Sequence, residues 1–229
     1  MSETAGKKPA NLPKRNFQRE LERILTETET SGSVPRLLLH SCCAPCSSYV
    51  LEYLSDYFEI TDLFYNPNIA PESEYRYREE ELDRLIRSMP LRNPVHFLRG
   101  AYDPDTFYEA VRGLEAEREG GSRCRVCYEL RMREAAKMAA EGRFDYFTTT
   151  LSISPLKNAQ WINEIGEALE KEYGVKHLPS DFKKRGGYQR SIELSAIYRL
   201  YRQDFCGCVF SRREKKGSND PPETLKKHG

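Results

Sequence analysis

Short apolar runs alternate with amphipathic segments along this chain, and this alternation restricts the folds that are open to it. Runs such as residues 36–40 and 60–65 have the length and composition of buried strands. The segments between them place apolar residues three and four positions apart, which is the spacing of one helix face. The alternation predicts an α/β domain with a doubly wound, mostly parallel sheet flanked by helices.

The same patterns predict where the elements lie. Strands are expected at residues 36–40, 60–65, 95–98, 144–149 and 175–178. Among the helices, one is expected over residues 103–119, and another begins near Cys124 and ends at Gly142. A last helix, after Gly186 and Gly187, is expected to carry Leu194, Ile197, Tyr198 and Tyr201 on one face.

Three segments are predicted along the chain. Residues 1–35 form an N-terminal extension with one short helix capped by Asn16, and residues 28–35 read as a linker because they are rich in Ser, Thr, Gly and Glu. Residues 36–211 form the α/β catalytic domain that carries the metal site. Residues 212–229 are basic and are expected to be disordered.

Composition narrows the class of protein. The 229 residues suffice for one sizeable α/β domain, and 31% of them are charged. No apolar run is long enough to span a membrane, and the N-terminal residues lack the apolar region of a secretory signal. We therefore expect a cytoplasmic protein without a membrane partner. In that compartment thiols stay reduced, so its seven cysteines are not read as a disulfide framework.

All seven cysteines fall into three groups, which are Cys42, Cys43 and Cys46; Cys124 and Cys127; and Cys206 and Cys208. The first group follows the strand at residues 36–40 and opens the next helix. Ligands of open α/β sheets bind beyond the carboxyl ends of the strands, and a helix N-terminus stabilises thiolates. The second group opens another helix beside several arginines. Sulfur or metal chemistry is therefore expected there.

Three kinds of thiol site fit this spacing. A structural zinc site with four cysteine ligands is the ordinary interpretation of two paired cysteine motifs. The adjacent Cys42 and Cys43 favour an iron–sulfur cluster, because a cluster with several metal corners accepts neighbouring thiolates more easily. Dithiol redox chemistry is the third kind. It suits Cys206 and Cys208, whose sulfurs could form a strained, reducible disulfide, although two free thiols are the alternative there.

The sequence lacks a Walker phosphate-binding loop, a dinucleotide-binding fingerprint and a c-type haem motif, so those chemistries are unsupported.

Charge is unevenly distributed along the chain although the net charge is only +1, because residues 175–229 contain 13 basic and 6 acidic residues. Lys183, Lys184 and Arg185 precede the predicted last helix, and Arg190 lies one turn into it. These four residues are a candidate phosphate clamp for RNA, with a solvated loop as the alternative.

Four motifs resemble those of QueH-type epoxyqueuosine reductases, and they lie at residues 40–46 (HSCCAPC), 65–68 (YNPN), 124–128 (CRVCY) and 201–208 (YRQDFCGC). The resemblance runs from about residue 40 to residue 211. It implies reduction of the epoxide of epoxyqueuosine in tRNA to the cyclopentene of queuosine, with an electron donor that the sequence does not identify. It also implies a fold related to the PP-loop ATPase type (adenine nucleotide alpha hydrolase-like).

The resemblance further implies a [4Fe–4S] cluster held by Cys42, Cys43, Cys124 and Cys127. Cys46 matches the position that supplies a ligand to a second mononuclear iron. We expect that iron, or an acid, to activate the epoxide oxygen while the cluster supplies electrons. Asp181 follows the strand at residues 175–178 and is a candidate ligand or proton donor, with a solvated carboxylate as the equal alternative.

Further residues near the predicted site have two interpretations each. Tyr65 and Asn66 end a strand at the same edge and could stack on or hydrogen-bond the base, although Tyr65 could equally be a core aromatic. His40 is expected to be a hydrogen-bonded structural residue, and Trp161 a core residue. The second function class that fits the sequence is a zinc-stabilised RNA-binding module whose cysteines are purely structural.

Overall fold

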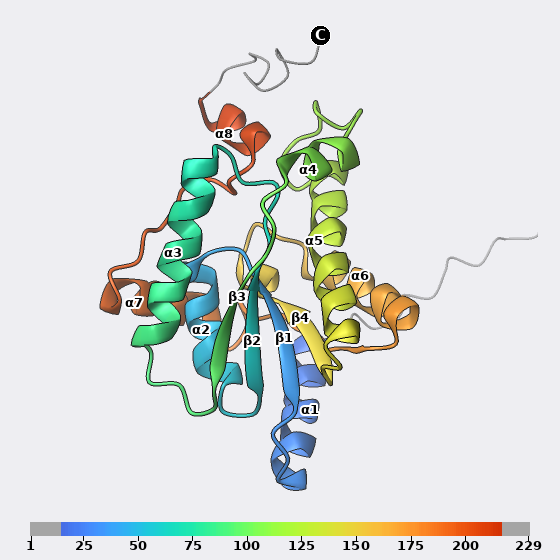
Figure 1. Cartoon of the computed structure of the whole chain (residues 1–229), viewed down its shortest axis with the longest axis vertical. Coiled ribbons are helices and arrows are strands. Elements are labelled where there is room, and N and C mark those ends of the chain that lie inside the picture. Colours follow the sequence, from blue (N-terminus) through green and yellow to red (C-terminus); the bar gives the residue numbers. More distant parts are fainter. Residues whose placement is uncertain (1–14, 217–229) are drawn as a thin grey trace, which may run out of the picture.

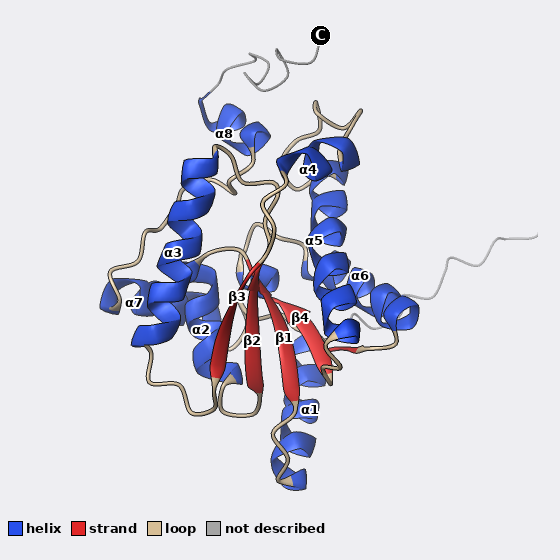
Figure 2. Cartoon of the chain, viewed as in Figure 1, coloured by secondary structure: helices blue, strands red, loops and turns tan. Residues whose placement is uncertain are grey.

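The computed structural model describes residues 15–216 and confirms the α/β class. Five parallel strands form one sheet in the order β3-β2-β1-β4-β5 (Figure 2). The elements in chain order are α1 (Phe17–Ser31), β1 (Arg36–Ser41), α2 (Ala44–Leu54), β2 (Glu59–Phe64), α3 (Glu72–Ser88), β3 (Val95–Arg99), α4 (Pro104–Ala110), α5 (Ser122–Glu141), β4 (Tyr146–Thr149), the 3₁₀ turn η1 (Thr150–Ile153), α6 (Ala159–Tyr173), β5 (Lys176–His177), α7 (Gly187–Ile197) and α8 (Val209–Lys216).

Helices cover both faces of the sheet. Helices α2, α3 and α7 lie on one side and α5 and α6 on the other, while α4 and α8 lie beyond the carboxyl ends of the strands (Figure 1). Leu37 and Leu39 of β1 join the core under α2 and α3, whereas Leu38 joins the core under α5 and α6. All three are fully buried. Burial of such a side chain contributes roughly 1.5–3 kcal/mol, so the continuous apolar run fixes β1 in the centre of the sheet.

The strand order places a topological switch point between β1 and β4. From β1 the chain winds outward through β2 to β3, then returns to the other side of β1 and winds outward again through β4 to β5. Loops that leave β1 and β4 therefore diverge, and they leave room for a ligand at that edge. The first cysteine group directly follows β1, so the fold puts the predicted thiol chemistry at the switch point.

The helix expected over residues 103–119 was wrong in length, because the observed α4 ends at Ala110. Gly113 has φ +82°, a left-handed conformation that favours glycine and ends regular helix here. The side chain of Arg123, which is 1% exposed, donates a hydrogen bond to the Glu115 carbonyl over 3.0 Å. A buried guanidinium thus holds this segment in a non-helical conformation that the local pattern does not predict.

The N-terminal helix is confirmed, with the Asn16 side chain accepting a hydrogen bond from the Arg19 N–H over 3.2 Å. The linker expected from residue 28 was wrong at its start, because α1 continues to Ser31. Thr28 is buried, and Gly32, with φ +65°, caps the helix by donating its N–H to the Glu29 carbonyl, so this Ser/Thr-rich segment is helical up to Ser31. Leu21 and Leu25 are buried in the core under α2, so α1 packs on the domain.

Two expectations at the C-terminal end were also wrong. Helix α7 ends at Ile197, whose side chain is 62% exposed, and Tyr201 lies beyond the helix. Arg199 has φ 52°, and the Tyr201 N–H donates to Glu81 on α3, so a tertiary contact redirects the chain. Helix α7 is not the last helix either, since α8 extends from Val209 to Lys216. The first residues of the expected tail, from residue 212, are therefore helical.

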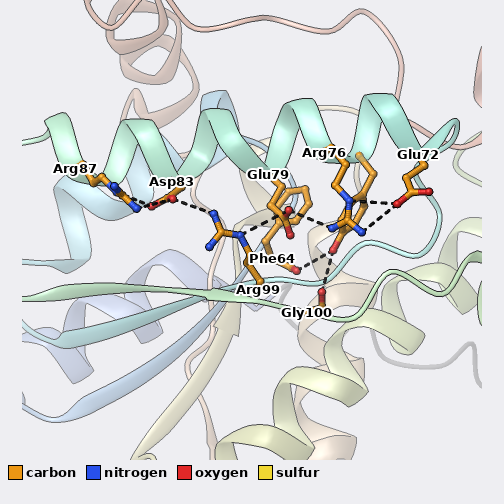
Figure 3. A network of polar contacts seen from close by, with 9 residues as sticks. Phe64, Glu72, Arg76, Glu79, Asp83, Arg87, Arg99 and Gly100 are labelled. Carbon is orange, nitrogen blue, oxygen red and sulfur yellow. Dashed lines mark hydrogen bonds and ion pairs between the residues drawn. The ribbon is translucent and has the colours of Figure 1, made fainter.

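A polar network ties α3 to the end of β3 (Figure 3). Asp83 accepts hydrogen bonds from Arg87 over 2.8 Å and from Arg99 over 3.1 Å, and Glu79 pairs with both Arg99 and Arg76. The arginines are largely exposed, so each pair contributes about 0–1 kcal/mol.

Within the described residues, no helix is both long and apolar enough to cross a bilayer.

Candidate functional site

The first thiol group occupies the turn between β1 and α2. Cys43 caps α2 in an extended conformation, and Pro45 in the first turn suits the fixed backbone geometry of a helix start. The sulfur atoms of Cys42, Cys43 and Cys46 all lie within 4.8 Å of one another, and the first two are 3.8 Å apart. Three convergent soft ligands of this kind can hold a metal ion.

The three thiols polarise one another. Hydrogen bonds from Cys43 and Cys46 hold the pKa of Cys42 well below its ordinary value, with the positive potentials of Lys157 and Arg131 acting in the same direction. The hydrogen bond with Cys42 raises the pKa of Cys43 to about 12, and the corresponding bond between Cys46 and Cys42 raises the pKa of Cys46. Cys42 is therefore the thiol of this group that loses its proton most readily.

The second and third cysteine groups come together in space. Cys124 and Cys127 lie in the first two turns of α5, and they line one small cavity together with Cys206 and Cys208. Burial raises the pKa of Cys127 to about 11 and raises that of Cys124. The Gly120 N–H donates to the Cys124 sulfur over 3.2 Å. All seven cysteines are free thiols in the structure.

The loop that carries Cys206 is held from α3. Arg78, which is 1% exposed, pairs with Glu74 and donates a hydrogen bond to the Cys206 carbonyl over 3.2 Å. The Ala70 N–H donates to the Gly207 carbonyl over 3.0 Å. Gly207 has φ +111°, and a Cβ there would lie 2.9 Å from Ile69, so only glycine fits this close approach.

A buried hydrogen-bond chain connects the two ends of the thiol site. The Asn66 amide donates to the Ser41 carbonyl over 2.8 Å, directly before Cys42. The Asn66 carbonyl oxygen accepts from Arg131 over 3.3 Å, and Arg131 Nε donates to the Cys127 carbonyl over 3.1 Å. The position of α5 relative to β1 is thereby fixed by side chains that are fully or almost fully buried.

A pocket of about 350 Å³ opens beside the thiols. Cys42, Cys46 and Cys206 line it, and so do the cationic side chains of Arg131 and Lys157. Burial opposes the charge of Lys157, but the negative potentials of Cys206, Cys42 and Cys46 outweigh it and raise its pKa. The pocket therefore combines nucleophilic sulfur with fixed positive charge, a setting that stabilises an anion formed during a reaction.

Two buried polar side chains of the site have hydrogen-bonding atoms without partners. Asn68 is 2% exposed, lines the cavity of Cys124 and Cys127, and has no hydrogen-bond partner for either atom of its amide among the described residues. Arg131 Nη2 is buried and equally lacks a partner in that part of the chain. Buried polar groups are normally satisfied, so these donors are positioned to bind a group that occupies the cavity.

His40 is the structural residue that the sequence predicts. Its ring nitrogens lie 2.8 Å from Thr149 Oγ1 and 3.0 Å from the Tyr65 carbonyl, and burial lowers its pKa to about 4. Asn66 is fully buried and its amide is used internally, so the expectation that it contacts a base was wrong. Tyr65 belongs to the core beneath α5, and Trp161 packs at the edge of the same core.

The predicted phosphate clamp is divided by the structure. Asp181 pairs with Lys183 over 2.5 Å and Arg185 pairs with Glu22 over 2.9 Å, and all three basic residues of the loop line a second, larger cavity together with Asp181. Arg190 pairs with Glu52 and Glu193 and does not line that cavity. Asp181 is absent from the lining of the thiol pocket.

Sequence reasoning missed the contributions of Arg78 and Lys157. Arg78 lies in the middle of a highly charged helix, where its sequence neighbours suggest a solvated residue. Lys157 lies in the loop between η1 and α6, far from every cysteine in the sequence. Asn68 was missed as well. A local signal for it existed, because it belongs to the Tyr-Asn-Pro-Asn motif, of which the sequence analysis singled out only the first two residues.

Comparison with known proteins matches the family model described as epoxyqueuosine reductase QueH to residues 37–214. The epoxyqueuosine reductase QueH of Staphylococcus epidermidis is 44% identical over 200 residues, which cover 86% of this chain and 84% of that protein. The protein of the same name from Streptococcus pyogenes serotype M1 is also 44% identical, over 86% of this chain and 78% of its own. The epoxyqueuosine reductase QueH of Thermotoga maritima is 38% identical, over 78% of this chain and 93% of that protein.

Proposed function

Since this chain belongs to the epoxyqueuosine reductase QueH family of oxidoreductases, we propose that it reduces the epoxide of epoxyqueuosine in tRNA and so forms queuosine. The reaction breaks both carbon–oxygen bonds of the epoxide and forms a carbon–carbon double bond. It consumes two electrons from a low-potential one-electron reductant and two protons, and the oxygen leaves as water. The zinc-stabilised RNA-binding module loses its support, because the family consists of enzymes.

One observation carries this proposal. Seven free thiols from three distant parts of the sequence converge at the switch point of the sheet, and two of the groups border a pocket that also holds Arg131 and Lys157. Purely structural zinc sites are closed by four ligands and leave no pocket. Thiols beside a pocket of about 350 Å³ instead suit a reaction on a bound small group.

The cysteines supply the thiolate donors that iron–sulfur clusters use. Cys42, Cys43 and Cys46 lie within 4.8 Å of one another, whereas Cys124 and Cys127 line the neighbouring cavity. Following the family resemblance, Cys42, Cys43, Cys124 and Cys127 would hold a [4Fe–4S] cluster, and Cys46 would bind an adjacent mononuclear iron. Such a pair of groups supplies electrons singly and polarises an oxygen as a Lewis acid. The closeness of Cys46 to Cys42 and Cys43, within 4.8 Å, supports a metal at this place.

The protein's own side chains have separate tasks in this proposal. Arg131 and Lys157 hold positive charge at the pocket, where an alkoxide develops when the first carbon–oxygen bond breaks. Lys157 Nζ is the group that we expect to donate a hydrogen bond to that oxygen. Asp181, which the sequence offers as a candidate ligand or proton donor, is less well supported because it pairs with Lys183 and lines the other cavity.

Cys206 and Cys208 remain a proposed redox pair. Cys206 lines both the thiol pocket and the cavity of Cys124 and Cys127, so it lies between the two other groups. We expect the pair to pass electrons as a dithiol that oxidises to a disulfide, with release of two electrons and two protons. Replacement of either cysteine by serine should then lower turnover and leave the iron content unchanged.

The test of the function is chemical. Protein purified without oxygen should be brown and contain about four or five irons, with sulfide to match a cluster. Incubated with dithionite and tRNA that carries epoxyqueuosine, it should convert the nucleoside to queuosine, as measured by mass spectrometry of tRNA digests. Colourless protein with one tightly bound zinc, or epoxyqueuosine that persists with fully loaded protein, would contradict the proposal.

Matched cysteine variants separate the two proposed metal sites. Cys124→Ser should lose iron and sulfide together, because it removes a cluster ligand. Cys46→Ser should lose only the iron in excess of the cluster and retain the sulfide. If Cys46→Ser instead loses all sulfide, the assignment of Cys46 to a second metal is wrong.

A further inference from the structure

A second cavity, larger than the thiol pocket and next to it, has no role in the chemistry proposed so far. It has a volume of about 1090 Å³, and three segments line it: the start of α1, the start of α6, and the loop of residues 181–185 before α7. Its basic lining residues are Arg15, Arg19, Lys157, Lys183, Lys184 and Arg185, whereas its acidic lining residues are only Glu164 and Asp181. We refer to it below as the basic groove.

Part of this positive charge is free of internal partners. Arg15 pairs with Glu20 and Glu167, Arg185 pairs with Glu22, and Lys183 pairs with Asp181. Across residues 15–216, by contrast, no acidic side chain forms an ion pair with Arg19 or Lys184. Cations that are left without internal partners in a concave surface attract an external polyanion.

Two helix N-termini add to the same field. The capping residues Asn16 of α1 and Asn158 of α6 both line the basic groove. Because these capping residues line the groove, the positive end of each 15-residue helix faces it. Free N–H groups of a first helical turn bind phosphate oxygens, so the groove offers backbone donors in addition to side-chain cations.

Lys157 connects the basic groove to the site of the proposed reaction. It lines the groove and the thiol pocket at once, so the two cavities share a wall. A strand that follows the groove would therefore bring one of its nucleotides to the thiols. The pocket volume of about 350 Å³ suits one modified nucleoside, whereas the groove, with about 1090 Å³, offers further space for its neighbours.

We propose that the basic groove binds the phosphates of the RNA strand next to the modified nucleotide, and that α1 is part of the RNA-binding surface. This inference rests on the proposed tRNA substrate. The family model matches residues 37–214, and the inference assigns a function to α1, which lies before that range. It also divides the predicted clamp, because Lys184 faces the groove whereas Arg190 does not line it.

The experiment measures RNA binding separately from turnover. Fluorescence anisotropy would record the affinity of the metal-loaded full chain for an unmodified anticodon stem-loop RNA over a series of salt concentrations. The groove variant is Arg19→Gln with Lys184→Gln. The control is Arg23→Gln with Arg190→Gln, which removes the same charge from the same helix and from α7 but leaves the groove lining intact.

We expect the groove variant to bind about tenfold more weakly, with a salt dependence of log Kd shallower by about 1.4, or about 0.7 for each lost phosphate contact. The control should bind like the unchanged protein. Equal affinity of the groove variant and the unchanged protein would overturn the inference, as would an equal loss in the control.

Turnover distinguishes failure of this inference from failure of the function. If both hold, the groove variant should raise the KM for tRNA and reduce the free epoxyqueuosine nucleoside at the rate of the unchanged protein. If the unchanged, loaded protein reduces neither substrate, the function fails while the anisotropy result still decides the groove. A groove variant with an unchanged KM for tRNA would contradict the inference alone.

Discussion

Arg131 on α5 donates a hydrogen bond over 3.3 Å to Asn66, the second residue after the end of β2. Both side chains are almost fully buried, and each also bonds the backbone beside a cysteine, Asn66 at Ser41 and Arg131 at Cys127. Two cysteine motifs that are about eighty residues apart in the sequence are thus held in register by one side-chain pair.

Removal of Asn66 should loosen this connection. Asn66→Ala leaves the Ser41 carbonyl and one Arg131 donor buried without partners, which should lower the free energy of unfolding by roughly 2–4 kcal/mol. Urea unfolding and anaerobic iron content would both be measured, and both should fall. Asn158→Ala, which removes only an exposed helix cap, should cost about 1 kcal/mol and leave iron content unchanged. Equal behaviour of the two variants would contradict this role of Asn66.

Gly207 should tolerate no side chain. In Gly207→Ala the new Cβ would lie 2.9 Å from Ile69 Cγ1 and 3.2 Å from Arg78 Nη1, in a left-handed backbone conformation. The Cys206 loop must shift, so we expect slower epoxide reduction and a stability loss of roughly 1–3 kcal/mol. Gly32→Ala is the control, since Gly32 also has positive φ but nothing within 4 Å. It should be destabilised by about 1–2 kcal/mol through the backbone conformation alone, with normal activity.

The contact between α6 and β5 depends on a helical glycine. A Cβ on Gly166 would approach the His177 ring to 2.3 Å, so Gly166→Ala should destabilise the protein by roughly 1–3 kcal/mol despite the higher helix propensity of alanine. His177→Ala removes the ring that the new methyl group meets. The double variant should therefore lose less stability than the sum of the two single variants, as measured by denaturant unfolding. Strict additivity would show that the ring is not the obstacle.

Protein stability should fall below neutral pH because of buried histidines. Burial lowers the pKa of His177 to about 3, and neither ring nitrogen has a hydrogen-bond partner among residues 15–216. A histidine in the unfolded chain takes up a proton near pH 6.5, whereas the folded ring stays neutral down to a much lower pH. The contribution of His177 to stability is therefore complete above pH 6.5 and is lost as the pH falls below it. At pH 5 the loss from His177 should be about 2 kcal/mol relative to pH 7.5.

The matched variant for this measurement is His177→Leu. Urea unfolding at pH 7.5 and pH 5 should show a difference between the two pH values that is about 2 kcal/mol smaller in the variant. Asp62, whose pKa burial raises to about 7, acts with the opposite sign but is present in both proteins, so the comparison isolates the histidine. An unchanged pH dependence would show that His177 is protonated in the folded state.

The sequence predicts most of the architecture because the information for it is local. The apolar run of β1 is buried on both faces, and Asn16 and Gly142 mark helix ends that the structure confirms. The expected helix over residues 103–119 failed because the buried Arg123 binds that segment from α5. The expected linker from residue 28 failed because Thr28 is buried and the helix continues to its cap at Gly32.

The sequence by itself determined that thiols lie at the carboxyl end of the first strand, because a short apolar run followed by cysteines and a helix has few other arrangements in a parallel sheet. Only the tertiary structure decided which thiols share a cavity, which cations face them, and that α1 borders a basic groove. Those relationships bring Arg78 to Cys206, and Arg131 and Lys157 to a pocket lined by cysteines far away in the chain. Packing of whole elements sets such distances, and no local pattern records them.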